Sequence, residues 1–363
     1  MKRWLLWLLL AAVLTACEQV SYYTQAVRGQ TSILLSRQSI SDLLNDPALD
    51  QHLREQLQIV ESARQFAETN LGLPARGSFT TFVDPGREHL VWNVFAAPWN
   101  SVDPMGWCFP IAGCVSYRGY FSEQAAQRYA RRLSQKGYDV FVGGVDAYST
   151  LGWFRDPLPA TVLGRSEDQL AGLIFHELAH QRIYLPGDTA FNESFASFVE
   201  RQGLQWWQVS QGREIQMQQI VQAQQLQQRF ALHIAEFREQ LNLLYRSEMA
   251  TETEMRERKQ LIMDAMRNSW LAGPDAPAYA GWFAGEINNA RLATVGTYYD
   301  YVPAFEQLFR LSGENLERFY ARVEELVRLP ALEREQVLLE LLSAPSEQEG
   351  EGFLPLALGY RGL

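Results

Sequence analysis

The sequence predicts an α+β protein that is mainly α, with a small mixed sheet and a helical C-terminal half containing a long helical hairpin. Short stretches rich in β-branched and aromatic residues, broken by glycine and proline, are confined to residues 76–121 and the region just after 137. Apolar residues recur at helical spacing in residues 38–70 and in most of the chain after 166. Glutamine-rich amphipathic sequence runs from about 204 to 270, which is long enough for two paired helices.

The N-terminus predicts an export signal rather than part of the fold. "MKR" is a short basic segment, "WLLWLLLAAVL" is apolar, and "LTAC" resembles a bacterial lipobox that ends at Cys17. We expect a signal peptide at residues 1–16, an anchor and linker at 17–37, and a single folded domain at 38–363. The alternative is an ordinary signal peptide with a chance cysteine.

The lipobox resemblance implies a location for the protein and a membrane as its first partner. Acyl chains on Cys17 would anchor the body to a membrane without threading the chain through it. The expected place is the bacterial cell envelope, facing the periplasm. Glu18 stands where an aspartate commonly marks retention in the inner membrane, so the outer membrane is favoured over the inner one.

The first half of the body is predicted to hold two helical segments and the sheet. Residues 38–70 are expected to be helical until Gly72 and Pro74 end the pattern. Residues 122–136 are expected to form a second helix, which Gly137 stops. Four stretches are typical of strands, and "LGWFRDPLP" after the last of them is expected to be a loop: "GSFTTFVD", "HLVWNVFAAP", "GCVSYRGYF" and "YDVFVGGVDAYST".

Three cysteines allow one disulfide once Cys17 is set aside for acylation. Cys108 and Cys114 stand in "CFPIAGC", a short loop made turn-prone by proline and glycine. Export places them in an oxidising compartment, so we expect them to pair. The alternative is two buried free thiols.

The second half is predicted to be almost entirely helical. Ser166 is a suitable N-cap for a helix that ends at "PGD", and another helix starts near Asn192. "TETE" at 251–254 fits a capping box that begins the second arm of the hairpin. "LAGPDAPAYAG" is expected to be a loop, residues 282–342 mostly helical, and the rest a loose tail. The alternative for the glutamine-rich part is a disordered polar tract.

The charge balance limits the partners. The chain has 363 residues and a formal net charge of −10, and no basic block stands out. A nucleic-acid partner is therefore not expected. The helical hairpin is a candidate surface for a protein partner.

The stretch "FHELAHQR" is the most informative about chemistry. His176 and His180 lie four residues apart on a predicted helix, so both imidazoles point to one face. Two neutral imidazoles make half of a tetrahedral zinc shell. Glu177 would reach alongside such a metal, where a general base takes a proton from water. The alternative, two incidental histidines, is disfavoured by the apolar flank "AGLIF", because buried polar groups without partners are costly.

A third ligand has two candidates on the following helix. Glu193 follows His180 after twelve residues, and Glu200 follows it after nineteen. The longer gap matches the spacing of thermolysin-type enzymes, so spacing alone favours Glu200.

Local sequence favours Glu193 instead. "HELAHQ" is shared with aminopeptidase-N-like zinc aminopeptidases, and "FNESFASFVE" resembles their "NEGFASYVE" stretch. This resemblance implies that Glu193 is the third ligand of one Zn²⁺ per chain, and that Glu200 supports the site without binding the metal. The loop between the two helices is shorter here, and the "GAMEN" strand of that family is absent.

Over its full length the chain resembles a predicted aminopeptidase family of Gram-negative bacterial lipoproteins. The lipobox, "GCVSYRGYF", "HELAHQ", "NESFA" and "NNARLA" carry this resemblance. It implies a zincin-like metallopeptidase core of the gluzincin type and a peptide substrate. The name of that family itself rests on the zinc motif, so it does not establish the activity independently.

Two further groups are candidates for substrate contacts. Tyr298, in "TYYDY", could stabilise the oxyanion of a peptidase, although core or rim packing is the alternative for these tyrosines. Arg291, beside Asn288 and Asn289, could hold a substrate carboxylate or pair with an acidic neighbour, and we favour the pairing. The strand candidate with Gly143 and Gly144 precedes the metal helix, where peptidases of this class add their substrate to a sheet edge.

The sequence therefore predicts a zinc-dependent peptidase, and by resemblance an aminopeptidase, with Glu177 as the general base. The alternative is a non-catalytic envelope lipoprotein with a structural metal site, whose hairpin binds a partner. The presence of Glu177 favours the enzyme, because a structural metal site needs no base.

Overall fold

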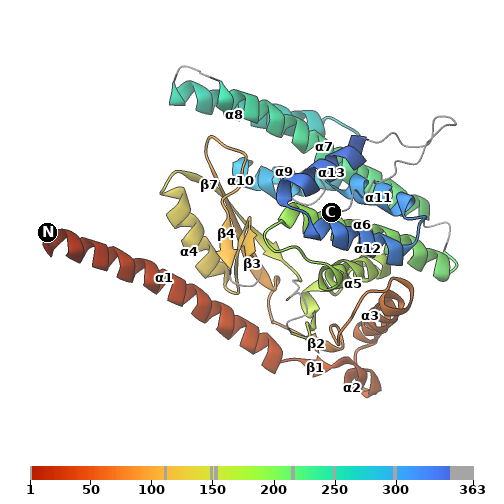
Figure 1. The fold of residues 1–363 in the computed structure, drawn as a ribbon. Helices are drawn as coiled ribbons and strands as arrows, with labels where there is room; N and C mark the ends of the chain where they lie inside the picture. Colours follow the sequence, from red (N-terminus) through yellow and green to blue (C-terminus); the bar gives the residue numbers. More distant parts are fainter. Residues whose placement is uncertain are drawn as a thin grey trace, which may run out of the picture.

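The structure is a computed structural model that describes residues 2–109, 113–147, 150, 154–213, 217–247, 251–296 and 301–343. Figure 1 shows a mainly helical molecule in which a small group of strands lies between helix α4 (Glu123–Ser134) and the other helices of the body. The predicted fold class, α+β and mainly α, is confirmed.

The strands form three small sheets. One is mixed and contains β1 (Gln38–Ser39), β2 (Thr81–Val83) and β8 (Leu158–Pro159). The second is antiparallel, with β3 (Val91–Pro98) between β6 (Arg118–Tyr120) and β7 (Tyr138–Val145). The third is the hairpin of β4 (Trp107–Phe109) and β5 (Gly113–Val115). All four predicted strand regions contain strands, whereas β1 and β8 lie where a helix and a loop were expected.

The central sheet has two different faces. Val94 and Ala96 of β3 pack with residues of α4, and helix α4 covers this face. Phe95 and Ala97 point to the opposite face, where they pack with Tyr117, Phe141 and Ala290 of α10 (Asn289–Gly296). This second face is the one that looks toward the helical half.

The N-terminal helix α1 (Lys2–Leu35) covers one edge of that sheet. The side-chain oxygen Oε1 of Gln25 accepts a hydrogen bond from the backbone N–H of Phe121 at 2.9 Å, just beyond β6. The Tyr22 ring lies 5.5 Å from that of Tyr120, and Ile33 is buried against Val83 and Leu90. The stretch expected as anchor and linker is therefore helical and packed on the body. None of the helices in the described ranges has the length and apolar character needed to cross a membrane.

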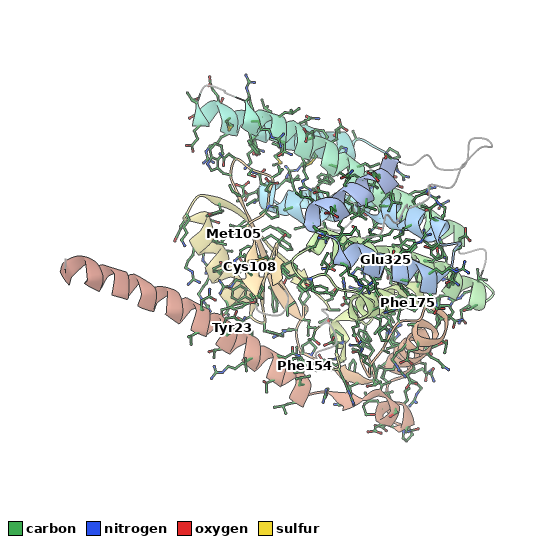
Figure 2. The ribbon with its side chains drawn as sticks, viewed as in Figure 1. Tyr23, Met105, Cys108, Phe154, Phe175 and Glu325 are labelled. Atoms are coloured by element: carbon green, nitrogen blue, oxygen red, sulfur yellow. A yellow bond between two sulfur atoms is a disulfide. The ribbon has the colours of Figure 1, made fainter. Side chains whose placement is uncertain are left out.

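The main core surrounds two antiparallel helices, α5 (Glu167–Arg182) and α6 (Thr189–Ser210), which are packed side by side. Phe175 and Phe195 are fully buried in it, and Figure 2 shows Phe175 inside the helical half. The predicted first helical segment divides at Asp46 into two helices. The helices around α5 and α6 are α2 (Ile40–Asn45), α3 (Gln51–Asn70), α11 (Val302–Leu311), α12 (Leu316–Arg328) and α13 (Ala331–Ser343).

The predicted helical hairpin is present as α7 (Met217–Arg246) and α8 (Glu252–Leu271). Thr251 caps α8, and its hydroxyl accepts from the backbone N–H of Glu254. The residues from 204 to 210, expected in the hairpin, belong to α6 instead. The expected loop at 271–281 was wrong in its second half: α9 (Ala276–Ala284) begins there, because a proline in the first turn favours a helix start.

The β4–β5 hairpin contains the disulfide between Cys108 and Cys114, and Figure 2 shows Cys108 among the strands. Its backbone lies directly on the loop that joins α5 to α6. Gly113 has φ +73°, and a Cβ atom there would lie 2.6 Å from the backbone nitrogen of Gly187. Only glycine therefore permits this contact.

Candidate metal centre

Helix α5 begins and continues as the sequence predicts. The Ser166 hydroxyl accepts from the backbone N–H of Gln169, and the Gln169 side chain accepts from the backbone N–H of Ser166, which completes a capping box. Two turns further on, the helix presents His176 and His180 on one side, with their ring centroids 4.9 Å apart.

Helix α6 is positioned by its start and by close packing against α5. Asp188 caps it by accepting from the backbone N–H of Phe191 at 3.1 Å. A Cβ atom at Gly203 would lie 2.8 Å from the Phe175 ring, so this glycine lets the two helices approach closely. The Asn192 side chain bonds both backbone groups of Leu185, which fixes the short connecting loop. These contacts place the first turn of α6 opposite the two histidines.

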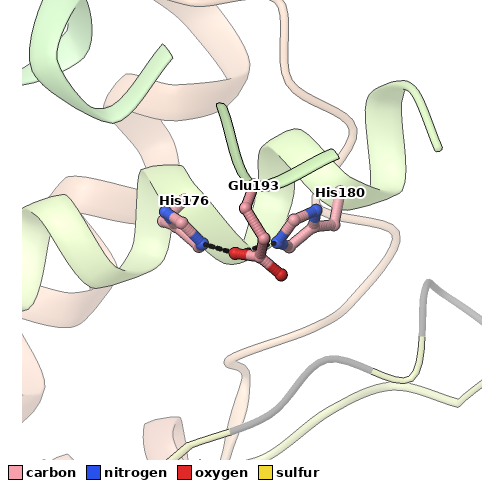
Figure 3. A group of neighbouring side chains, drawn as sticks. All are labelled: His176, His180 and Glu193. Carbon is pink, nitrogen blue, oxygen red and sulfur yellow. Dashed lines mark hydrogen bonds and ion pairs between the residues drawn. The ribbon is translucent and has the colours of Figure 1, made fainter. Parts of the chain in front are cut away.

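Three side chains converge between these helices (Figure 3). His176, His180 and Glu193 each offer one ligand atom, and these atoms all lie within 4.8 Å of one another. One carboxylate oxygen of Glu193 is 3.3 Å from Nε2 of His176 and 3.7 Å from Nε2 of His180. Two imidazoles and a carboxylate are the donors that catalytic zinc sites use, so this group fits a zinc ion.

Glu200 meets the opposite nitrogen of His176. Its Oε2 lies 3.1 Å from Nδ1 of that ring. Gly172, one turn before His176, leaves space for the Glu200 side chain, because a Cβ atom there would lie 3.0 Å from the Glu200 carboxylate. A carboxylate on the far side of a ligand imidazole fixes its tautomer and orientation. Glu193 and Glu200 therefore meet different nitrogens of the same ring.

The charges of this group shift the pKa of each member. Burial acts to lower the pKa of His176, but the carboxylates of Glu193 and Glu200 outweigh it and raise that pKa well above its ordinary value. Burial opposes ionisation of Glu193, yet the two histidines beside it hold its pKa below the ordinary value. For His180, burial is the largest influence on the pKa; it lowers that pKa to about 4 and keeps the ring neutral at pH 7. A neutral imidazole is the form that binds a metal.

Glu177 is buried beside this group, with 9% of its surface exposed. Burial raises the pKa of its carboxyl to about 7; the charge of His176 opposes this, and Glu193, Asp156 and Glu200 add to the rise. No hydrogen bond links its carboxylate to any residue that the structure describes. A carboxyl group with a pKa near neutrality is suited to taking and returning a proton at that pH.

A polar network next to Glu177 was not predicted. The Ser78 hydroxyl accepts from the side chain of Gln181 at 3.1 Å and from the backbone N–H of Asp156 at 3.3 Å. The Asp156 carboxylate accepts from the backbone and hydroxyl of Thr150. Ser78 thereby ties the end of α5 to the segment before β8. These residues are far apart in sequence and carry no motif, so no pattern pointed to them.

Two tyrosines near the metal group were also missed. The Tyr184 ring lies 6.5 Å from that of His180, and burial together with the charge of Glu193 raises its pKa. The pKa of Tyr117 is raised by burial and then by Glu193, Tyr184 and Glu177. Tyr184 continues the four-residue spacing of the histidines, which was an available signal. Tyr298 lies outside the described residues, whereas the backbone N–H of Tyr301 donates to the hydroxyl of Ser194, next to Glu193.

Among the residues that the structure describes, Arg291 makes no ion pair with an acidic neighbour, in contrast to the pairing that we favour from the sequence. Its guanidinium lies 5.0 Å from the ring centroid of Phe141 and 5.3 Å from that of Trp282. Asn288 and Asn289 are buried and bond to backbone atoms of the central sheet. These three residues lie on α10 or just before it, on the face of the sheet that carries Tyr117 and Phe141.

Comparison with known proteins gives one match. A family model described as "Putative aminopeptidase" matches residues 21–338. The matched range contains every residue of the metal group and the disulfide, and it starts after Cys17. No curated protein and no solved structure matches the chain.

Proposed function

The chain belongs to the putative aminopeptidase family, and on that premise we propose that it is a zinc-dependent peptidase that removes residues from the amino end of peptides. The observation that carries the proposal is the convergence of His176, His180 and Glu193 beside the buried Glu177. Family membership supports peptidase activity in general. The donor set and the neighbouring base support zinc and the hydrolytic chemistry.

In this proposal His176, His180 and Glu193 hold the metal, and Glu200 orients the His176 ring through Nδ1. A bound zinc ion would supply Lewis acidity, which activates water for attack at neutral pH and polarises a carbonyl group. The neutral state of His180 suits it as a ligand. Three protein ligands, with no fourth group beside them among the described residues, would leave a zinc ion a position for water and substrate.

Glu177 is the proposed general base. Its carboxylate takes the proton of the attacking water and later delivers it to the amine that leaves. Both steps need a carboxyl group that changes its protonation state near neutral pH, and the burial of Glu177 supports this. A purely structural metal site would gain nothing from a buried carboxyl that no described residue bonds, and this disfavours the non-catalytic alternative.

Tyr117 is the proposed donor to the developing oxyanion. Its hydroxyl is close enough to Glu193 and Glu177 for their charges to act on its pKa. It lies just before β6 and packs on the central sheet, whereas the metal group comes from α5 and α6, so a substrate carbonyl could lie between them. A donor aimed at the developing charge from the far side of the substrate is the arrangement that stabilises an oxyanion.

The Glu177→Gln variant tests the proposal most directly. It keeps the size and hydrogen-bonding ability of the side chain and removes the base. Zinc content and Tm should change little, while turnover of peptides by the purified body should fall by about 10²–10⁴-fold. Cleavage by Glu177→Gln at the wild-type rate would refute the mechanism, and a zinc-loaded wild type that cleaves no peptide of a broad library would favour the binding-protein alternative.

A further inference from the structure

Strand β7 is an edge strand whose outer side is partly free. The carbonyl of Ala96 accepts from Met105, so Ala96 does not bond its partner Val140 across the sheet. The Val145 carbonyl accepts from Leu90 on the β3 side. Alternation along the strand therefore turns the backbone groups of Val140, Val142 and Gly144 away from β3. Within the described residues, nothing bonds the outward groups of Val142 and Gly144.

One end of this edge is closed. The side-chain amide of Asn288 donates to the carbonyl of Val140 at 3.1 Å. The preceding residue Asp139 accepts from the backbone N–H of Asn289 at 2.8 Å and from Lys259 of the hairpin. An added strand can therefore pair with residues 141–145 and cannot continue past Val140. The open part suits a peptide of about five residues, since antiparallel strands pair residue for residue.

A positive charge that no described carboxylate pairs with lies at the closed end. The guanidinium of Arg291 lies between the rings of Phe141 and Trp282, and one of its nitrogens donates to the carbonyl of Glu286 at 3.1 Å. Its Nε is buried without a hydrogen-bond partner in the described part of the chain. No carboxylate there lies within ion-pair distance, although the chain has a formal net charge of −10. The pKa of Arg291 is lowered by burial and by the nearby charge of Arg267.

We propose that Arg291 binds the C-terminal carboxylate of a short peptide that adds antiparallel to β7 at Val142 and Gly144. This inference rests on the proposed peptidase function and names its substrate class as oligopeptides with a free carboxyl end. A guanidinium matches a carboxylate in shape and charge, which favours this ligand over other anions.

The direction of the added strand follows from the charge. In an antiparallel pairing the carboxyl end of the peptide lies beside Phe141, next to Arg291, and its amino end lies toward Val145. A parallel peptide would instead bring its ammonium group to the guanidinium, and the two would repel. Holding the carboxyl end leaves the amino end free, which fits removal of N-terminal residues.

The metal group and Arg291 share the same side of the sheet. Tyr117, Phe95 and Phe141 lie in a row across this face, with ring centroids 5.7 Å and 6.2 Å apart. The proposed oxyanion donor is at one end of the row, and Arg291 is over the other. The row runs across the strands, so a peptide that lies along the edge of β7 meets it only at its carboxyl end, beside Phe141.

The test measures binding separately from cleavage. Pentaalanine is prepared as the free acid and as the C-terminal amide, and each is titrated calorimetrically into the Glu177→Gln protein. The free acid should bind about 10–100-fold more tightly, the usual range for a hydrogen bond to a charged group. Arg291→Gln in the same background should abolish the difference, and Arg291→Lys should restore part of it.

Arg267→Gln is the matched control, because it removes the same charge from the neighbouring arginine and should keep the preference for the free acid. Equal binding of acid and amide, a preference that survives in Arg291→Gln, or no binding of either peptide would overturn the inference. The proposed function fails separately: a preference for the free acid without cleavage by the wild type leaves Arg291 as the anchor and rejects the peptidase. Cleavage of the acid and the amide with equal kcat/KM would instead support the peptidase and reject Arg291 as the anchor.

Discussion

At the scale of single residues, Glu193 and Glu200 occupy different places around His176, although spacing alone favours Glu200 as the third ligand. Both lie on the same helix, seven residues apart, and both meet His176. Glu193 reaches Nε2, between the two rings, whereas Glu200 reaches Nδ1 behind one ring. The short loop after α5 brings the first turn of α6 opposite the histidines, so the earlier glutamate takes the inner place. A gap counted in residues does not reveal which nitrogen a carboxylate will meet.

This division predicts different results for the two glutamates. Glu193→Ala removes one of three proposed ligands and should abolish the binding of one zinc ion per chain. Glu200→Ala leaves the ligands in place and should weaken zinc binding by only about 10–100-fold. The measurement is zinc content after dialysis, followed by competition with a chelator. Zinc retention in Glu193→Ala together with loss in Glu200→Ala would reverse the assignment.

The two tyrosines can be separated in the same way. Tyr117→Phe should lower kcat by about 10²–10³-fold, the effect of losing one oxyanion donor, with little change in zinc content. Tyr184→Phe removes a tyrosine hydroxyl just after α5 and should lower kcat less than tenfold. The measurement is steady-state kinetics on a peptide that the wild type cleaves in a broad peptide library. If Tyr184→Phe is the slower enzyme, Tyr117 is not the donor.

At the scale of elements, the loop between α5 and α6 sets the metal group because it is held from several sides. Asn192 bonds Leu185 within the loop, and Arg334 of α13 pairs with Asp188 at 3.0 Å. The disulfide hairpin packs on it at Gly113 and Gly187. A displacement of this loop would move Glu193 relative to His176 and His180, since it joins the helices that carry them.

The contact between hairpin and loop can be tested by a single methyl group. Gly113→Ala would place a Cβ atom 2.6 Å from the Gly187 nitrogen, at a backbone φ of +73° that alanine adopts poorly. The variant should lose about 1–3 kcal/mol of stability and bind zinc less tightly. Gly106→Ala is the control, because nothing lies within 4 Å of a Cβ there. Thermal unfolding and zinc titration of both variants provide the measurement; equal behaviour would show that the contact is unimportant.

Sequence patterns located the elements where local signals are strong. Ser166 marks the start of α5, and the β-branched and aromatic residues of β3 mark a strand. The two-residue strands β1 and β8 have no such signal, because only their pairing with β2 makes them strands. The motif and the stretch after it pointed to His176, His180 and Glu193, whereas Tyr117 and Asp156 come near them through tertiary packing that no local pattern encodes. Arg291 shows the same limit: its sequence neighbours suggested an ion pair, and the fold placed aromatic rings there.

At the scale of the whole molecule, the N-terminal helix joins the predicted anchor to the body. Gly29 lies against the Phe121 side chain, and Tyr22, Gln25 and Ile33 share the same inner side. Val20 and Val27 lie on the outer side and are exposed. The helix therefore has one side packed on the sheet edge and one side that faces outward.

We expect the precursor to be acylated at Cys17. Cys17→Ser should leave the body in the soluble fraction or leave an unprocessed precursor, because two acyl signals are needed for stable anchoring and none would remain. The measurement is fractionation of cell envelopes with a mass determination of the N-terminal peptide. Replacing Cys108 and Cys114 together by serine should leave the protein in the membrane fraction. Unchanged membrane attachment of Cys17→Ser would rule out the lipid anchor.

The docking of α1 has a consequence for how the protein would meet its substrates. Between Cys17 and the first residue packed on the sheet, Tyr22, there are only five helical steps, or about 8 Å at 1.5 Å per residue. A protein anchored at Cys17 would have almost no tether length: it could not sweep the space above the bilayer, nor turn freely on its anchor. It would glide along the surface at a fixed height and tilt, and it would encounter only peptides that come to that surface.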